Sequence, residues 1–258
     1  MLALYNKQFG NLGGDKSFFI TSSDGVEYAA SRETVSQRSA STIKLFILTS
    51  AYEKAQRGEL NMSSNYTVKS SDIVVASTAL ANSAGQTYSL DTIARFMVQY
   101  SDNTATNIMI SAIGGVSAVN AEIRRMGYTQ TTLNRYMRIQ SQIDAGLENY
   151  INVHEAVDLL KNIYNNTLQN TTAEPTMLAD LSNNYYKLWL PASIQSQAQT
   201  WDKPGNDGTF GVENDIAAIK VNGKTYIVGV LTQHTGSNGV SNTGVFANFG
   251  KSIVTVMA

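Results

Sequence analysis

The apolar positions of the chain are grouped differently at its two ends and in its middle. Apolar segments at 17–21 and 26–30 flank a polar turn that contains Gly25, which predicts a β-hairpin near the N-terminus. Segments 215–219 and 226–231 flank Asn222-Gly223, a dipeptide typical of a two-residue hairpin turn. A terminal helix is expected from Val240. Strands are thus expected at both ends of the chain.

The middle of the chain has the spacing of helices. The segment from Ser41 to about Gly58 is apolar almost all round, which predicts a helix buried in the centre of the protein. Further helices are expected at 90–99, 103–113, 116–126 and 153–165. This order favours an α/β fold of the α+β type, with an antiparallel sheet built from both termini, flanked by helices, and an inserted all-helical lobe.

Two lobes follow from this order. Residues 1–38 and 190–258 are expected to form the α/β sheet lobe, and residues 39–189 the helical lobe. A cleft between such lobes is the expected place for an active site.

Composition excludes several classes of function. The 258 residues carry a net charge of −1 and 43% hydrophobic residues, so neither nucleic acid nor anionic lipid is an expected partner of this globular chain. With no cysteine, disulfides and thiol chemistry are excluded. No membrane span or signal peptide is evident, and a monomer is expected. A secreted or cell-surface location is expected if a signal peptide has been removed.

The most informative pair of residues is Ser41 and Lys44. Three residues of separation on a helix place a hydroxyl and an amine on one face. A serine attacks carbonyls when a neighbour takes its proton, and a poorly solvated lysine does this once it has lost its own. The pair is a candidate nucleophile and base, but a capping serine and a solvated lysine show the same spacing.

Two further motifs follow in order: Ser101-Asp102-Asn103, and Lys203-Pro204-Gly205 near the C-terminal strands. Ser-x-x-Lys, Ser-Asp-Asn and Lys-Thr/Ser-Gly form the motif set of class A β-lactamases and penicillin-binding proteins, which the chain resembles over nearly its whole length. The resemblance implies a β-lactamase-like fold, a bacterial serine hydrolase associated with antibiotic resistance, and no cofactor or metal.

The resemblance also assigns roles. Ser41 forms the acyl-enzyme, and Lys44 accepts its proton or organises it electrostatically. Ser101 relays a proton to the leaving nitrogen, helped by the charge of Lys203, while Asn103 holds Lys44 and binds the substrate amide. The oxyanion hole consists of the backbone N–H groups of Ser41 and Asn206, beside Gly205. For Ser101 and Asn103 a helix cap is the alternative reading, and for Lys203 a surface lysine before a turn.

The chain departs from the family at two positions. Met137 stands where class A enzymes have the Ω-loop glutamate that activates the deacylating water, and a thioether accepts no proton from water. Glu148, Gln140 or Gln142 are the candidates to replace it. Pro204 stands where the family has a hydroxyl that binds the β-lactam carboxylate, and the arginine usual on the next strand is not evident near 212–215.

The expected function is therefore a serine hydrolase that forms an acyl-enzyme with β-lactams or related cell-wall peptide amides and deacylates slowly. Two alternatives remain: a non-catalytic protein that binds penicillin or peptidoglycan peptides, and an esterase or D-amino-acid peptidase on the same scaffold.

Overall fold

The computed structural model describes residues 1–168, 173–235 and 241–257. Its backbone clusters into two compact units. The sheet unit comprises residues 1–42, 151–167 and 186–258, and the helical unit comprises residues 43–150 and 168–185. The segment 151–167 groups with the sheet, although its place in the sequence predicts the helical lobe. The predicted lobe boundaries otherwise remain a prediction.

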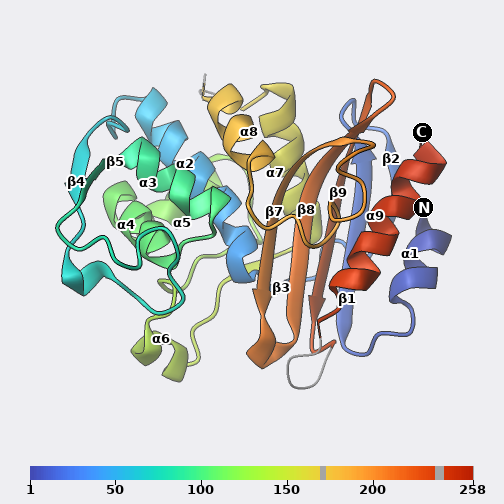
Figure 1. Cartoon of the computed structure of the whole chain (residues 1–258), viewed down its shortest axis with the longest axis horizontal. Coiled ribbons are helices and arrows are strands. Elements are labelled where there is room, and N and C mark those ends of the chain that lie inside the picture. Colours follow the sequence, from blue (N-terminus) through green and yellow to red (C-terminus); the bar gives the residue numbers. More distant parts are fainter. Residues whose placement is uncertain (169–172, 236–240, 258) are drawn as a thin grey trace. The chain divides into compact units, whose positions relative to one another are not determined.

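The sheet unit is built on five antiparallel strands in the order β2-β1-β9-β8-β7 (Figure 1). The strands are β1 (Asp15–Ser22), β2 (Glu27–Ser31), β7 (Gln199–Asp207), β8 (Val212–Val221) and β9 (Lys224–Gln233). The hairpin β1–β2 confirms the first predicted pair of strands. The hairpin β8–β9 turns at Asn222-Gly223 as predicted, but its strands are longer than the apolar segments because polar residues continue the ladder.

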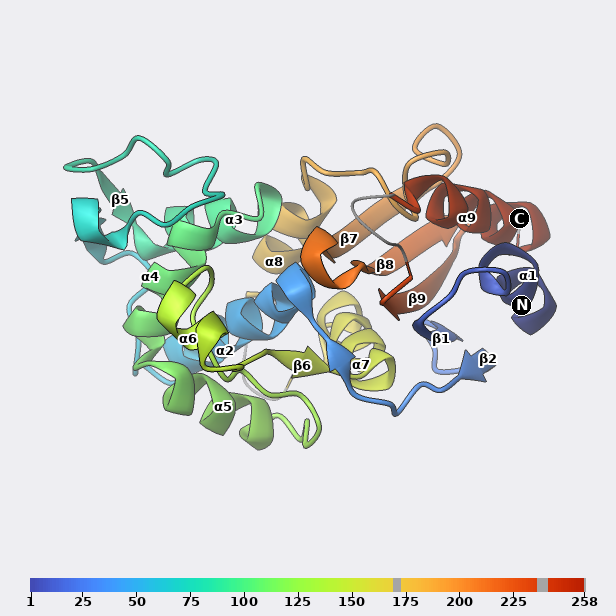
Figure 2. The same ribbon diagram turned by 90° about the horizontal axis from the view of Figure 1, so that it is seen from below.

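Helices cover both faces of this sheet. On one face α1 (Leu2–Phe9) and α9 (Thr243–Met257) lie side by side, with Phe9 and Phe249 buried against Val228 and Val230 of β9 (Figures 1 and 2). On the other face α7 (Val153–Asn165) packs so closely that a Cβ on Gly229 would lie 2.4 Å from the Val153 side chain. The alternation of β9 therefore separates a phenylalanine-rich layer from the α7 layer.

The helical unit is arranged around α2 (Lys44–Gln56), in which Lys44 through Glu53 are all buried. This confirms the predicted central helix. Its other helices are α3 (Leu90–Gln99), α4 (Asn103–Ile113), α5 (Val116–Arg125), α6 (Gln140–Asp144) and α8 (Glu174–Ser182), and β4 (Asn65–Thr67) pairs with β5 (Thr87–Ser89). The bounds of α3, α4 and α7 agree with those predicted from sequence.

Three short helices were not predicted from the sequence. The apolar spacing of α1, α6 and α8 is too brief for a periodic signal, since each has nine residues or fewer. The predicted start of the last helix, Val240, lies outside the described residues, and α9 is observed from Thr243. Across the described part of the chain, the helices are too short or too polar to span a membrane.

Candidate active site

Ser41 lies on a 3₁₀ turn, Ala40–Ile43, that leads directly into α2. The cap position of α2 is Ile43, so Ser41 does not cap this helix, and that alternative reading is wrong. Ala40, just before the serine, has φ 43°, in the left-handed region that non-glycine residues avoid. Backbone strain of this kind costs about 1 to 3 kcal/mol and concentrates at functional sites.

In the helical unit the structure brings Lys44, Ser101 and Asn103 together. The fully buried ammonium of Lys44 donates to the Ser101 carbonyl at 2.6 Å, the Ser101 hydroxyl at 3.2 Å and Asn103 Oδ1 at 3.0 Å. Ser101 has φ 52°, a second strained position. A polar network in a water-poor interior is rigid when its members are satisfied, so Lys44 is held in one orientation.

Asp102 explains how this arrangement is fixed. Its carboxylate caps α4 by accepting from Ala105 N at 2.8 Å, and it also accepts from Thr78 N at 2.7 Å and Leu80 N at 3.0 Å. Asp102 therefore has the capping role that was the alternative reading for its two neighbours, Ser101 and Asn103. Both of these neighbours hydrogen-bond Lys44 instead.

In the sheet unit, Gly205 of β7 lies directly against the turn that carries Ser41. A Cβ at this position would lie 2.6 Å from the backbone nitrogen of Ser41 and 2.8 Å from that of Thr42. Only glycine permits so close a backbone approach. The turn is further held by Asn214 on β8, whose side chain donates to the carbonyls of Arg38 and Ser39 at 2.8 and 3.2 Å. Sequence reasoning missed Asn214, because one amide within the polar run Glu213-Asn214-Asp215 gives no pattern.

Lys203 is buried in β7, with 1% of its surface exposed, so it is not a surface lysine before a turn. Its ammonium donates to the Pro204 carbonyl at 2.8 Å. Burial lowers the pKa of Lys203 to about 8, against the opposing effect of the Asp202 and Asp215 carboxylates. Burial, followed by the charge of Asp202, raises the pKa of Asp215. A lysine with such a pKa gains or loses its proton, and with it its positive charge, near neutral pH.

Pro204 fits its strand because β7 is the edge of the sheet, where a missing N–H breaks no essential ladder bond. It pairs with Asp215 across the ladder, and the next pairs are Gly205 with Asn214 and Asn206 with Glu213. Asn206 thus follows the close-approach glycine by one residue along β7.

The loop that carries Met137 is closed by an ion pair. The Arg135 guanidinium contacts Glu148 Oε1 at 2.7 Å, and both side chains are largely buried. Glu148 therefore closes the loop rather than standing at the position of Met137. Met137 itself is 6% exposed, and its backbone N–H and C=O are both bound by the Asn107 side chain, at 2.7 and 2.9 Å.

The two glutamines suggested as replacements are also engaged elsewhere. Gln142 Oε1 accepts the Tyr136 backbone N–H at 2.8 Å, and Gln140 donates to Asp144 at 2.7 Å on an exposed helix. The side chains of all three candidates are thus bound to groups other than Met137, whose backbone is held by Asn107.

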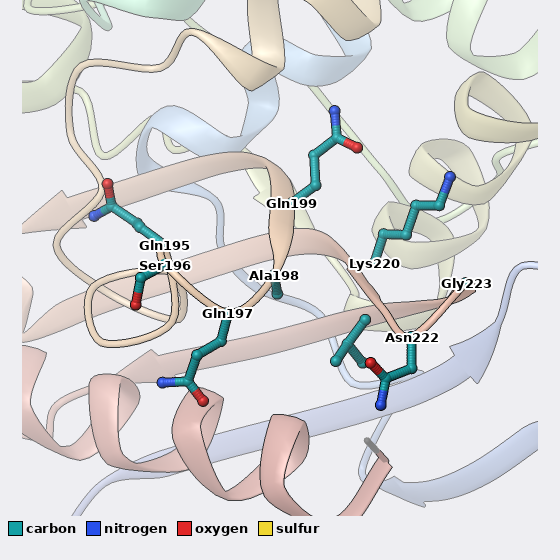
Figure 3. A pocket seen from close by; sticks show the side chains of 9 residues that line it. Gln195, Ser196, Gln197, Ala198, Gln199, Lys220, Asn222 and Gly223 are labelled. Carbon is teal, nitrogen blue, oxygen red and sulfur yellow. The ribbon is translucent and has the colours of Figure 1, made fainter.

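A hollow of about 500 Å³ on the sheet unit contains none of the predicted site residues. Figure 3 shows that its side chains diverge, with Gln199 and Lys220 pointing to one side and Gln197 and Asn222 to the other. Binding sites instead have polar groups that converge on a ligand. Among the described residues, there is also no cluster of three or more side chains suited to hold a metal ion.

Comparisons with known proteins agree with the motifs. The model of a family described as "Beta-lactamase enzyme family" matches residues 4–257. β-Lactamase ROB-1 of Haemophilus influenzae is 27% identical over 205 residues, which are 76% of this chain and 65% of that enzyme. β-Lactamase PSE-4 of Pseudomonas aeruginosa is 34% identical over 95 residues, 37% of this chain and 33% of that enzyme. The aligned regions thus span less than two thirds of either relative.

Solved structures show the same fold. A β-lactamase from Chitinophaga pinensis superposes with a TM-score of 0.90 at 16% identity, covering 100% of this chain and 99% of that one. PBP-A superposes with a TM-score of 0.87 at 18% identity, covering 100% and 96%. The family match over nearly the whole chain, together with this shared fold, confirms the resemblance seen in the sequence: the chain belongs to the β-lactamase enzyme family.

Proposed function

We propose that this protein is a serine hydrolase that forms an acyl-enzyme at Ser41 with β-lactams or related cell-wall peptide amides, and releases the acyl group slowly. The observation that carries the proposal is the buried Lys44 ammonium bonded to Ser101 and Asn103, three residues after a serine on a strained turn. Structural packing alone gives no reason to bury such a cation.

In the proposed reaction the Lys44 ammonium first releases a proton of its own, and the amine then accepts the proton of Ser41 as Ser41 Oγ attacks the amide carbonyl. Ser101 passes a proton to the leaving nitrogen, and the C–N bond breaks. The backbone N–H groups of Ser41 and Asn206 stabilise the oxyanion, a task for which the loss of one donor typically costs about 10² to 10³ in rate. Gly205 supports this assignment because it lets β7 approach the Ser41 nitrogen.

Slow deacylation is proposed from Met137. Its thioether supplies no general base, and general-base assistance is typically worth about 10² to 10⁴ in rate. One related structure is that of a PBP-A mutant as an acyl-enzyme complex with penicillin G. That neighbour shares the fold with a TM-score of 0.87, which makes penicillin G a suitable first probe.

The proposal is tested by turnover of a chromogenic cephalosporin and by the lifetime of the penicillin G adduct. We expect acylation by the parent, none by Ser41→Ala, and an adduct that persists far longer than a catalytic cycle of an ordinary β-lactamase. Hydrolysis by Ser41→Ala at the parent rate would remove the proposal. An unmodified parent that still binds penicillin would favour the non-catalytic alternative, and a preference for D-alanyl esters or peptides would favour the esterase or peptidase.

A further inference from the structure

A cavity of about 240 Å³ lies in the sheet unit beside Asn206. Asn206 and Glu213, which are partners across the β7–β8 ladder, both line it, together with Leu188, Trp189 and Asn242. The cavity thus begins one residue along β7 from Gly205, the glycine that contacts the Ser41 turn. Asn206, whose backbone N–H is proposed above as an oxyanion donor, is therefore itself one of the residues that line the cavity.

Glu213 carries the only charge among the described residues that line the cavity. Its side chain is 8% exposed and is fixed by two donors: the Ser241 hydroxyl at 2.8 Å on Oε1, and the Asn242 backbone N–H at 2.7 Å on Oε2. A carboxylate oxygen has room for about two hydrogen bonds, so each oxygen retains acceptor capacity. The cavity therefore offers negative charge and acceptors.

The other walls favour an organic cation. Trp189 and Leu188 supply apolar surface, and the face of an indole attracts ammonium groups. Pro204, two residues before Asn206, has no hydroxyl to offer an anion. Arg38 does not line the cavity; its guanidinium carbon lies 3.9 Å from the centroid of the Phe210 ring. A carboxylate-bearing group entering here would meet Glu213 as a like charge.

We propose that Glu213 makes this cavity selective for a substrate that carries an ammonium group on its leaving-group side, and disfavours one with a carboxylate there. The cavity is assigned to the leaving-group side of the substrate for the following reason. In the family, the hydroxyl at the Pro204 position binds the carboxylate of a penicillin, and this carboxylate lies on the ring that holds the leaving nitrogen. This inference rests on the proposed acylation of Ser41. Glu213 is a specificity residue in it and takes no part in bond breaking.

The test uses two thioesters with the same phenylacetylglycyl group. One has 2-mercaptoethyl-trimethylammonium as its leaving thiol, and the other has 3-mercaptopropionate. Ser41 Oγ attacks the carbonyl, the C–S bond breaks, and the released thiol is measured with a disulfide reagent. We expect the parent to react about ten-fold faster with the cationic thioester, a preference that high salt reduces.

Glu213→Gln is expected to abolish the preference, and Glu213→Asp to retain it. Glu27→Gln is the matched control, because it removes one negative charge at the exposed β2, on the opposite edge of the sheet, and is expected to keep the parent preference. If Glu213→Gln does not fold, the salt dependence of the parent's preference for the cationic thioester still tests whether that preference is electrostatic.

Equal rates for the two thioesters in the parent, or a preference unchanged in Glu213→Gln, would overturn the inference and leave acylation of Ser41 standing. If neither thioester nor penicillin G modifies Ser41, the proposed function fails, and this inference fails with it. The two failures are therefore distinguished by the mass of the protein.

Discussion

Substituting alanine for Gly205 places a single methyl group between β7 and the turn that carries Ser41. The added carbon would lie 2.6 Å from the Ser41 nitrogen and 2.8 Å from the Thr42 nitrogen, whereas ordinary contacts begin at 3.4 Å. The turn and the strand must therefore separate by about 0.8 Å. Both obstacles are backbone atoms, so rotation of a side chain does not relieve the clash.

A displacement of this size disturbs the two N–H groups proposed to form the oxyanion hole. Misplacement of reacting groups by about 1 Å costs about 10² in rate, and loss of one oxyanion donor costs about 10² to 10³. We expect the second-order rate of acylation by penicillin G to fall by about 10² to 10³ in Gly205→Ala, within this range.

The matched control is Gly244→Ala in α9, where, among the described residues and apart from its chain neighbours and its own helix backbone, no atom lies within 4 Å of the added carbon. It is expected to acylate at the parent rate and to be slightly more stable, because alanine favours helix more than glycine does. The assay is a quenched time course followed by intact mass, with circular dichroism to confirm folding. A folded Gly205→Ala protein that acylates at the parent rate would show that the close approach of β7 to the Ser41 turn does not limit acylation.

Three further predictions concern deacylation and pH. Met137→Glu supplies a carboxylate at the position where the resemblance implies the general base, and it is expected to shorten the lifetime of a penicillin adduct by about 10² or more. An unchanged lifetime, measured by mass, would show that Met137 does not limit turnover, and Met137→Gln is the uncharged control. Burial lowers the pKa of Lys203 to about 8 from an unfolded value of 10.5, so the folded protein loses this charge as pH rises through 8. We expect the rate of acylation to decline above pH 8. A rate of acylation that stays the same up to pH 10 would contradict a role for that charge. Burial and the Asp91 carboxylate raise the pKa of Asp180 to about 6 from 3.8. Between pH 3.8 and pH 6 the Asp180 carboxyl is therefore protonated in the folded state and ionised in the unfolded state. The stability that Asp180 contributes is lost as pH rises through 6. Asp180→Asn is therefore expected to raise the free energy of unfolding by about 1 to 2 kcal/mol at pH 7.5 and to leave it unchanged near pH 3.5, whereas the exposed Asp144→Asn is expected to change neither.

Much of the fold was predictable because its long elements carry strong local signals. The spacing of apolar residues in α3, α4 and α7, each followed or preceded by capping residues, was sufficient to place those helices. The Asn222-Gly223 turn was sufficient to place the β8–β9 hairpin. The grouping of α7 with the sheet depends on contacts with distant strands, such as that of Val153 with Gly229, which no local pattern encodes.

The candidate site was predictable only where motifs encode it. Ser-x-x-Lys and Ser-Asp-Asn identified Lys44, Ser101 and Asn103, which the structure brings together. The roles of Asn214 in holding the Ser41 turn and of Glu213 in lining a cavity arise from strand register, which pairs these residues with Gly205 and Asn206. Register is set by the whole sheet and is not visible in the residues themselves.

The mass of the intact protein after incubation with penicillin G shows whether Ser41 forms an acyl-enzyme. We expect the parent protein to gain the mass of one penicillin, with the modification mapped to the peptide containing Ser41, and the mass of Ser41→Ala to stay unchanged. If the parent neither gains this mass nor consumes penicillin, or if the adduct also forms on Ser41→Ala, then Ser41 is not the acylated nucleophile.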